Sequence, residues 1–195
     1  MPKNTSPGTA LITGGSKRIG QAIALALAEM GYNIALHYNQ SRGDAEKTAD
    51  LAKKKGGKCT TFACDLSREK AVFALFKSVH QTFPDLNVLI NSASIFEKSG
   101  LNTASLEAFN RHFAINLKAP LILISEFARV CKKGNIINLL DTHIVKNKTA
   151  HFHTSARQSL GSGMIGEIIK HPCYFCGKLT LISSTFKSLC LIHKS

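Results

Sequence analysis

The chain has 195 residues, of which 44% are hydrophobic and 19% charged, with a formal net charge of +13. These values are typical of one globular domain with a substantial core, and without a long apolar run or a signal-like start we expect neither a membrane-spanning nor a secreted protein. A cytoplasmic protein with reduced cysteines is therefore expected. The lysines are dispersed and no nucleic-acid motif is found, so the positive charge indicates small anionic ligands rather than nucleic acid.

Short apolar strands alternate with helical stretches over the first 140 residues. Near-continuous apolar strands of this kind are typical of a parallel sheet that is covered by helices on both faces. The sequence therefore predicts a doubly wound α/β fold, with strands at about 9–13, 34–38, 59–63, 88–91 and 135–140, and helices at about 19–30, 44–55, from 67 to 83, and over 106–130.

The pattern changes near Phe152. Residues 153–195 show no comparable alternation, are interrupted by serine and glycine, and carry scattered histidine and cysteine. We therefore expect a nucleotide-binding domain over residues 1–152. The tail over 153–195 is expected not to continue this architecture, which leaves the sheet incomplete on its C-terminal side.

A glycine turn joins the first strand to the first helix. Residues 9–20 read Thr-Ala-Leu-Ile-Thr-Gly-Gly-Ser-Lys-Arg-Ile-Gly. Free backbone N–H groups and the positive end of the helix dipole bind phosphate at such a turn. The alternative is a helix start with no ligand. The candidate phosphate-binding residues are Gly14, Ser16, Lys17, Arg18, Ile19 and Gly20.

The end of the second strand indicates which dinucleotide binds. An acidic residue there binds the ribose 2′-hydroxyl of NAD, whereas basic groups suit the 2′-phosphate of NADP. The sequence His37-Tyr38-Asn39-Gln40-Ser41-Arg42 has no acidic residue before Asp44. It therefore predicts NADP as the cofactor, although an exposed polar loop would have the same composition. The candidate ligands of the 2′-phosphate are Lys17, Arg18, Ser41 and Arg42.

Four short motifs, in the correct order, resemble the short-chain dehydrogenase/reductase family. The turn fits Thr-Gly-x-x-x-Gly-x-Gly, with Arg18 in place of the middle glycine. The other three are Asp65-Leu66, similar to the adenine-contacting pair, Asn91-Ser92-Ala93-Ser94, similar to Asn-Asn-Ala-Gly, and Asn116, similar to the asparagine of the middle helix. The resemblance covers about residues 8–152 and implies a Rossmann-type fold. It also implies a homo-oligomer, although the segments of the family's usual dimer interface have no counterpart here.

Within the family the chain is most similar to pteridine reductases and related dihydrofolate-reducing enzymes. The residues that carry this are Lys17-Arg18, His37-Tyr38 with Ser41, and the run from Asn91 to Phe96. The resemblance implies hydride transfer from NADPH to a pterin or dihydrofolate-like substrate. It makes His37 and Tyr38 cofactor contacts, Ser94 a contact of substrate and cofactor phosphate, Phe96 a stacking face, and Asn116 and Asp141 catalytic residues. A core-packing role for Phe96 is equally compatible with the sequence.

The catalytic pair of the family is missing from its expected place. A tyrosine supplies the proton and a lysine four residues later lowers its pKa from a reference value of about 10. Counted from Asp141 by the pteridine-reductase spacing, the pair falls on positions 154 and 158, which hold Thr154 and Gln158. Neither side chain can perform this chemistry, so the chain is expected to be inactive or impaired.

Three explanations of the missing pair remain open. The C-terminal part can be out of register through a frameshift, or Tyr174 and Lys178 can be a displaced Tyr-x-x-x-Lys pair. The third explanation is a zinc site, because the spacing of four residues resembles a zinc ribbon. The chain would then be a non-catalytic nucleotide-binding remnant or an interaction protein with a zinc-stabilised tail. The four residues are Cys173, Cys176, Cys190 and His193.

Overall fold

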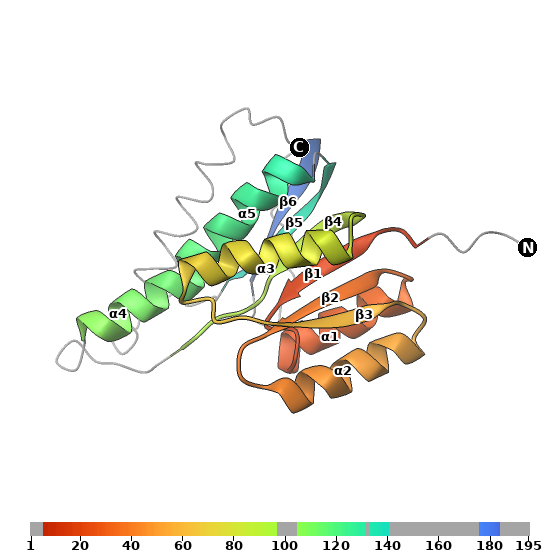
Figure 1. The fold of residues 1–195 in the computed structure, drawn as a ribbon, viewed down its shortest axis with the longest axis horizontal. Coiled ribbons are helices and arrows are strands. Elements are labelled where there is room, and N and C mark those ends of the chain that lie inside the picture. Colours follow the sequence, from red (N-terminus) through yellow and green to blue (C-terminus); the bar gives the residue numbers. More distant parts are fainter. Residues whose placement is uncertain (1–5, 97–104, 132, 141–175, 184–195) are drawn as a thin grey trace, which may run out of the picture.

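The computed structural model describes residues 6–96, 105–131, 133–140 and 176–183. Strands and helices alternate along the chain (Figure 1). The strands are β1 (Thr9–Thr13), β2 (Asn33–Tyr38), β3 (Cys59–Ala63), β4 (Leu86–Asn91), β5 (Lys133–Leu140) and β6 (Cys176–Ser183). The helices are α1 (Arg18–Glu29), α2 (Arg42–Lys54), α3 (Glu69–Thr82), α4 (Leu106–Phe113), the π-helical turn η2 (Ala114–Lys118) and α5 (Ala119–Val130).

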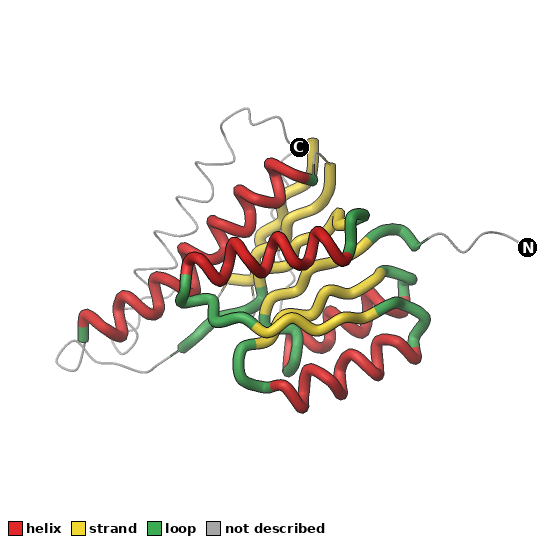
Figure 2. Tube along the Cα trace, in the orientation of Figure 1, coloured by secondary structure: helices red, strands yellow, loops and turns green. Residues whose placement is uncertain are grey.

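The strands form a parallel sheet in the order β3-β2-β1-β4-β5-β6. Helices α1 and α2 cover one face, and α3 and α5 cover the other (Figures 1 and 2). The predicted doubly wound α/β fold is therefore confirmed. The chain reverses its direction of winding between β1 and β4, and in such sheets ligands bind beyond the carboxyl ends of the strands at this point.

Strand β1 shows why a continuous apolar run forms the centre of the sheet. All five of its residues are buried. Leu11 packs into the core under α3 and α5, whereas Ala10 and Ile12 pack into the core under α1 and α2. Successive side chains of a strand point to opposite faces, so a strand with a core on each side needs apolar residues at consecutive positions. The buried hydroxyls of Thr9 and Thr13, at the two ends of the strand, each donate a hydrogen bond.

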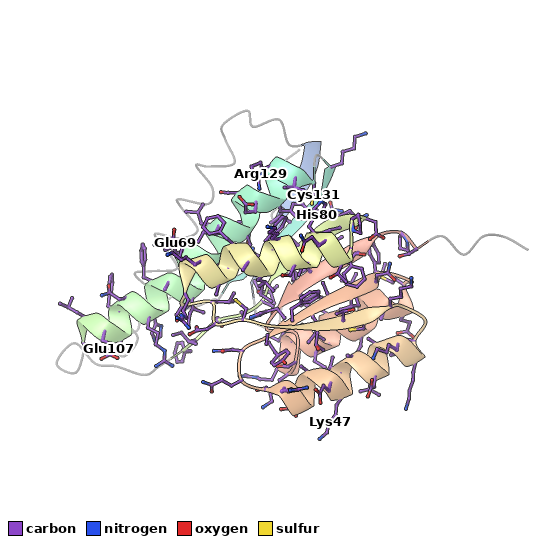
Figure 3. All side chains as sticks on the ribbon, in the orientation of Figure 1. Lys47, Glu69, His80, Glu107, Arg129 and Cys131 are labelled. Atoms are coloured by element: carbon purple, nitrogen blue, oxygen red, sulfur yellow. The ribbon has the colours of Figure 1, made fainter. Side chains whose placement is uncertain are left out.

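Charged side chains point away from these cores. Lys47 on α2 and Glu107 on α4 are exposed and project outward from their helices (Figure 3). Glu69 at the start of α3 forms an ion pair with Lys118 of η2. None of the helices within the described ranges is long and apolar enough to cross a membrane.

The expectation that the tail does not continue the sheet is wrong for one segment. Residues 176–183 form β6, which pairs in parallel with the whole of β5, from Lys133 opposite Cys176 to Leu140 opposite Ser183. A strand rich in Leu, Ile and Thr can satisfy the backbone groups of an edge strand whatever the pattern of the residues before it. The long helical region predicted over 106–130 is also divided by η2.

Candidate nucleotide-binding site

The turn after β1 has a backbone that requires glycine. Gly14 has a φ of 65°, and a Cβ at this position would lie 2.9 Å from the Cα of Ala93. A Cβ on Gly20 would lie 2.3 Å from the carbonyl oxygen of Gly14. The missing side chains therefore let α1 begin directly against the turn, and the turn lie against the segment after β4.

Arg18 occupies the position where the family motif has its middle glycine. Its φ of 52° is the only positive value for a non-glycine residue in the part of the chain that the structure describes. The left-handed conformation costs an ordinary residue roughly 1 kcal/mol, and such strain is concentrated at functional sites. Arg18 thus keeps the left-handed backbone that a glycine would adopt at this position. Its exposed side chain adds a guanidinium at the start of α1.

Two helices begin beside this turn without a side-chain cap. Neither Lys17, the N-cap of α1, nor Ser41, the N-cap of α2, accepts a capping hydrogen bond through its side chain. Serine at this position usually accepts one, so the Ser41 hydroxyl is available for another partner. Uncapped N–H groups and the helix dipole make both helix starts suitable for an anion.

The side chain of His37 holds the turn from inside the protein. His37 is 2% exposed, its Nδ1 accepts a hydrogen bond of 3.1 Å from the N–H of Gly14, and its Nε2 lies 3.0 Å from the carbonyl oxygen of Cys64. The backbone carbonyl of His37 also accepts a bond from the N–H of Gly15. Burial is the main cause that lowers the pKa of His37. The imidazole thus joins the turn to the end of β3, and Tyr38 follows it at the end of β2.

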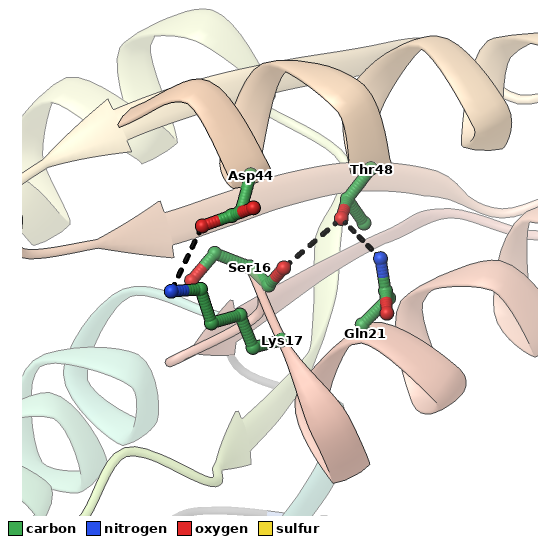
Figure 4. Close-up of polar contacts among 5 residues, drawn as sticks. All are labelled: Ser16, Lys17, Gln21, Asp44 and Thr48. Atoms are coloured by element: carbon green, nitrogen blue, oxygen red, sulfur yellow. Dashed lines mark hydrogen bonds and ion pairs between the residues drawn. The ribbon is translucent and has the colours of Figure 1, made fainter. Parts of the chain in front are cut away.

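Helix α2 is fastened to the turn by four side chains, of which only Lys17 belongs to the motif of the turn (Figure 4). The buried hydroxyl of Thr48 donates to the carbonyl of Ser16 at 3.1 Å and accepts from Nε2 of Gln21 at 2.8 Å. Nζ of Lys17 lies 2.9 Å from Oδ2 of Asp44. The position of Thr48 one turn after Asp44, on the face of α2 toward the core, is the only sequence signal that could have indicated these contacts.

The basic residues predicted to bind phosphate are partly neutralised by acids of α2. Lys17 is paired with Asp44, and Arg42 is paired with Glu46 at 2.7 Å. The hydrogen bond from Lys17 is the first cause that lowers the pKa of Asp44, and Glu46 raises the pKa of Arg42. All four groups are substantially exposed, and exposed pairs contribute little in water, so a phosphate can replace the carboxylates as the partner.

Asp65 and Leu66 lie directly after β3 and differ in their surroundings. Oδ1 of Asp65 accepts hydrogen bonds from the N–H of Ser67 at 2.9 Å and from its hydroxyl at 2.7 Å. These bonds lower the pKa of Asp65, so its carboxylate is ionised at neutral pH. The side chain of Leu66 is buried in the core under α3.

Thr13 joins the two loops of the site. Its Oγ1 accepts hydrogen bonds of 3.0 Å from the N–H groups of both Ser92 and Ala93. The carboxyl end of β1 is thereby connected to the run that follows β4. Asn91 is buried, and its Nδ2 donates to Oδ1 of Asn138 on β5 at 2.8 Å. Sequence reasoning did not assign a role to Thr13 or to Asn138.

Asn116 lies in η2 and fixes the segment that leads away from β4. Its Oδ1 accepts from the N–H of Ile95 and its Nδ2 donates to the carbonyl of Ile95, both at 2.9 Å. The same segment carries the two predicted substrate contacts. Ser94 is exposed and Phe96 is 43% exposed, so neither side chain is buried in the core.

The C-terminal residues considered for the catalytic pair and for the zinc site, together with Asp141, lie largely outside the described residues. These are Asp141, Thr154, Gln158, Tyr174, Cys173, Cys190 and His193. Cys176 and Lys178 are in β6. Among the described residues no group of three or more His, Cys, Asp or Glu side chains is arranged to hold a metal ion.

Comparison with known proteins gives the family. The sequence profile described as short chain dehydrogenase matches residues 8–149. The chain belongs to the short-chain dehydrogenase family. The match ends close to the position where the sequence pattern changes. It includes the turn after β1, the segment that follows β4 (the β4 loop) and η2.

Relatives and solved structures agree with this assignment. The chain is 37% identical to the uncharacterized oxidoreductase YgfF of Escherichia coli K12 over 118 residues, which are 60% of this chain and 48% of YgfF. A metagenomic short-chain oxidoreductase in complex with NADP has a TM-score of 0.86 and 25% identity, covering 93% of this chain and 83% of that one. The FolM alternative dihydrofolate reductase 1 of Brucella suis in complex with NADP has a TM-score of 0.81 and 26% identity, covering 91% and 72%. The chain spans 48% to 63% of the length of the curated relatives that it matches first.

Proposed function

We propose that this member of the short-chain dehydrogenase family binds NADP(H) at the turn between β1 and α1. The observation that carries the proposal is the pairing of two uncapped helix starts with basic side chains. Lys17 and Arg18 lie at the start of α1, and Ser41 and Arg42 at the start of α2. The stretch between Tyr38 and Ser41 contains no acidic residue that would repel a 2′-phosphate.

The residues of the site suit the pyrophosphate and the adenine of NADP(H). Gly14 and Gly20 lack the side chains that would hold α1 away from the turn, so the positive end of the helix lies directly beside the turn, which suits a pyrophosphate. Asp65 is ionised and its Oδ2 takes no part in the two bonds to Ser67, so this oxygen can accept from an adenine amino group. The backbone of the β4 loop is fixed by Thr13 beside the turn.

We infer further that the substrate class is a pterin or a dihydrofolate-like compound, to which bound NADPH would supply the hydride. The likeness to FolM alternative dihydrofolate reductase 1 supports this class, as do the exposed side chains of Ser94 and Phe96. Phe96 offers an aromatic face for a flat heterocycle. Asn116 fixes the backbone of Ile95, the residue that precedes Phe96.

We propose that the chain in this form reduces its substrate poorly. Thr154 and Gln158 occupy the positions counted for the proton-donating tyrosine and its lysine. General acid catalysis contributes about 10²- to 10⁴-fold to a rate, and neither a threonine hydroxyl nor a glutamine amide titrates in the required range.

Calorimetric titration of the full chain with NADP⁺ and NAD⁺ tests the cofactor. NADP⁺ is expected to bind more tightly. Lys17→Ala should weaken NADP⁺ binding by about 3- to 10-fold and leave NAD⁺ binding unchanged, because charge-assisted hydrogen bonds to the 2′-phosphate are lost. Lys77→Ala removes an exposed lysine of α3, on the opposite face of the sheet, and should change neither. Equal or tighter binding of NAD⁺ would overturn the assignment.

Loss of NADPH absorbance in the presence of a dihydropteridine or dihydrofolate tests the activity. The 195-residue chain should show no turnover above the background. A variant whose restored reading frame places Tyr and Lys near positions 154 and 158 should recover NADPH-dependent turnover. Robust turnover by the 195-residue chain that Tyr174→Phe abolishes would show that the catalytic pair is displaced rather than missing.

A further inference from the structure

The imidazole of His37 makes contacts that a residue with a packing role alone does not need. It is buried beneath the turn, where its Nδ1 accepts a hydrogen bond of 3.1 Å from the N–H of Gly14 and its Nε2 lies 3.0 Å from the carbonyl oxygen of Cys64. Gly14 belongs to the turn proposed to bind the pyrophosphate, and Cys64 immediately precedes Asp65, proposed to contact adenine. One side chain therefore connects two parts of the cofactor site that lie about 50 residues apart in the sequence.

We propose that His37 is a positioning residue for the dinucleotide, which acts only as the neutral tautomer with the proton on Nε2. This inference rests on the proposed function. In this tautomer Nδ1 accepts from the N–H of Gly14, and Nε2–H donates to the Cys64 carbonyl. The other tautomer and the imidazolium both carry a hydrogen on Nδ1, which would point at the hydrogen of Gly14 and push the turn out of place.

The surroundings of the ring favour the neutral form. Burial holds the pKa of His37 below its ordinary value of 6.5, and the bond to the Cys64 carbonyl opposes this only in part. The titratable groups beside the contacts of the ring are Cys64 and Asp65 after β3, Tyr38 on β2, and Lys17 and Arg18 in the turn. Burial raises the pKa of Cys64 to about 11, so this thiol is neutral near pH 7. Asp65 is bonded to Ser67 and Lys17 is paired with Asp44.

The direction of the pH effect follows from this. A buried histidine with a lowered pKa is neutral above pH 6.5, where the turn is held and affinity is at its full value. As the pH falls through the folded pKa, the ring gains a proton on Nδ1 and the turn loses its acceptor. NADP⁺ affinity is therefore expected to decrease by up to about 10-fold for each pH unit below that pKa.

Two substitutions separate the accepting atom from the shape of the ring. Asparagine places its side-chain oxygen near the position of Nδ1, so His37→Asn keeps an acceptor for Gly14 that cannot be protonated near pH 5–8. Phenylalanine fills the ring's space without an acceptor. His37→Phe should weaken NADP⁺ binding at pH 8 by about 10-fold, because the buried N–H of Gly14 is left without a partner. His37→Asn should stay within about 3-fold of the native affinity at pH 8, with the bond to Cys64 lost.

The experiment combines calorimetry of NADP⁺ binding between pH 8 and pH 5 with NMR of the cofactor-free chain. The 2′-phosphate itself titrates near pH 6, but it does so equally with both proteins, so the difference between native chain and His37→Asn isolates the histidine. The native chain should lose more affinity in acid than His37→Asn. The NMR spectrum should show His37, assigned by its absence from His37→Asn, as the Nε2–H tautomer at pH 7, and the Gly14 amide should shift with the same midpoint.

Each outcome decides a separate point. Identical pH profiles for the native chain and His37→Asn, an Nδ1–H tautomer at pH 7, or a Gly14 amide that does not respond to His37 would overturn the inference. Failure of His37→Phe to fold would leave the comparison with His37→Asn and the NMR titration to decide. Absence of NADP⁺ binding by the native chain, with the tautomer and the Gly14 shift as expected, would overturn the proposed function but keep His37 as the residue that positions the turn.

Discussion

Replacement of Gly20 by alanine should break the contact that brings α1 close to the turn. The added Cβ would lie 2.3 Å from the carbonyl oxygen of Gly14 and 3.1 Å from the Cα of Gly15. Both neighbours are backbone atoms, and His37 holds this part of the backbone in place, so the clash cannot be relieved by a side-chain rotation. Overpacking of this kind costs about 1–3 kcal/mol, and the higher helix propensity of alanine offsets at most about 1 kcal/mol of it.

The net loss of unfolding free energy for Gly20→Ala is therefore about 1–2 kcal/mol, which corresponds to a fall in Tm of roughly 2–8 °C for a chain of this size. Gly43→Ala is a matched control in α2. No heavy atom lies within 4 Å of the Cβ that it would add, so it should stabilise the chain by about 0.5–1 kcal/mol. Urea unfolding followed by circular dichroism measures both changes. The reasoning is refuted if Gly20→Ala is as stable as the native chain, or if the two variants shift in the same direction.

Three further results are expected. Thr13→Val removes the acceptor of two backbone N–H groups and should lower the free energy of unfolding by about 2 kcal/mol. Urea titration measures this change, and a loss below about 0.5 kcal/mol would contradict the expectation. Arg18→Gly relieves a positive φ, so the free energy of unfolding of this variant should be unchanged or up to about 1 kcal/mol higher than that of the native chain. Calorimetry should show weaker NADP⁺ binding, and a destabilised variant would contradict the expectation. Burial raises the pKa of Cys59, Cys64 and Cys131 to about 11, so these thiols should resist alkylation at pH 8 in the folded chain and react in urea. Mass spectrometry maps the labelled residues, and rapid labelling of the folded chain would refute this.

The sequence alone determined the elements whose signal is local. Strand β1 was predicted with the bounds that it has, Thr9–Thr13, because consecutive apolar residues between two threonines are a local signal of a strand with a core on both faces. The start of α1 was predicted to within one residue, because a glycine turn followed by an amphipathic pattern is a local signal. The family was likewise recognisable, since its motifs are short runs with a fixed order.

The tertiary structure alone decided how these pieces are joined. Thr13, Thr48 and the ring of His37 act through partners 23 to 80 residues away, and no short pattern indicates which distant backbone group a buried hydroxyl or imidazole will meet. The position of β6 is a further case. An edge strand is selected by the free backbone groups of its neighbour as much as by its own residues, so a segment that breaks the alternating pattern can still complete the pairing of β5.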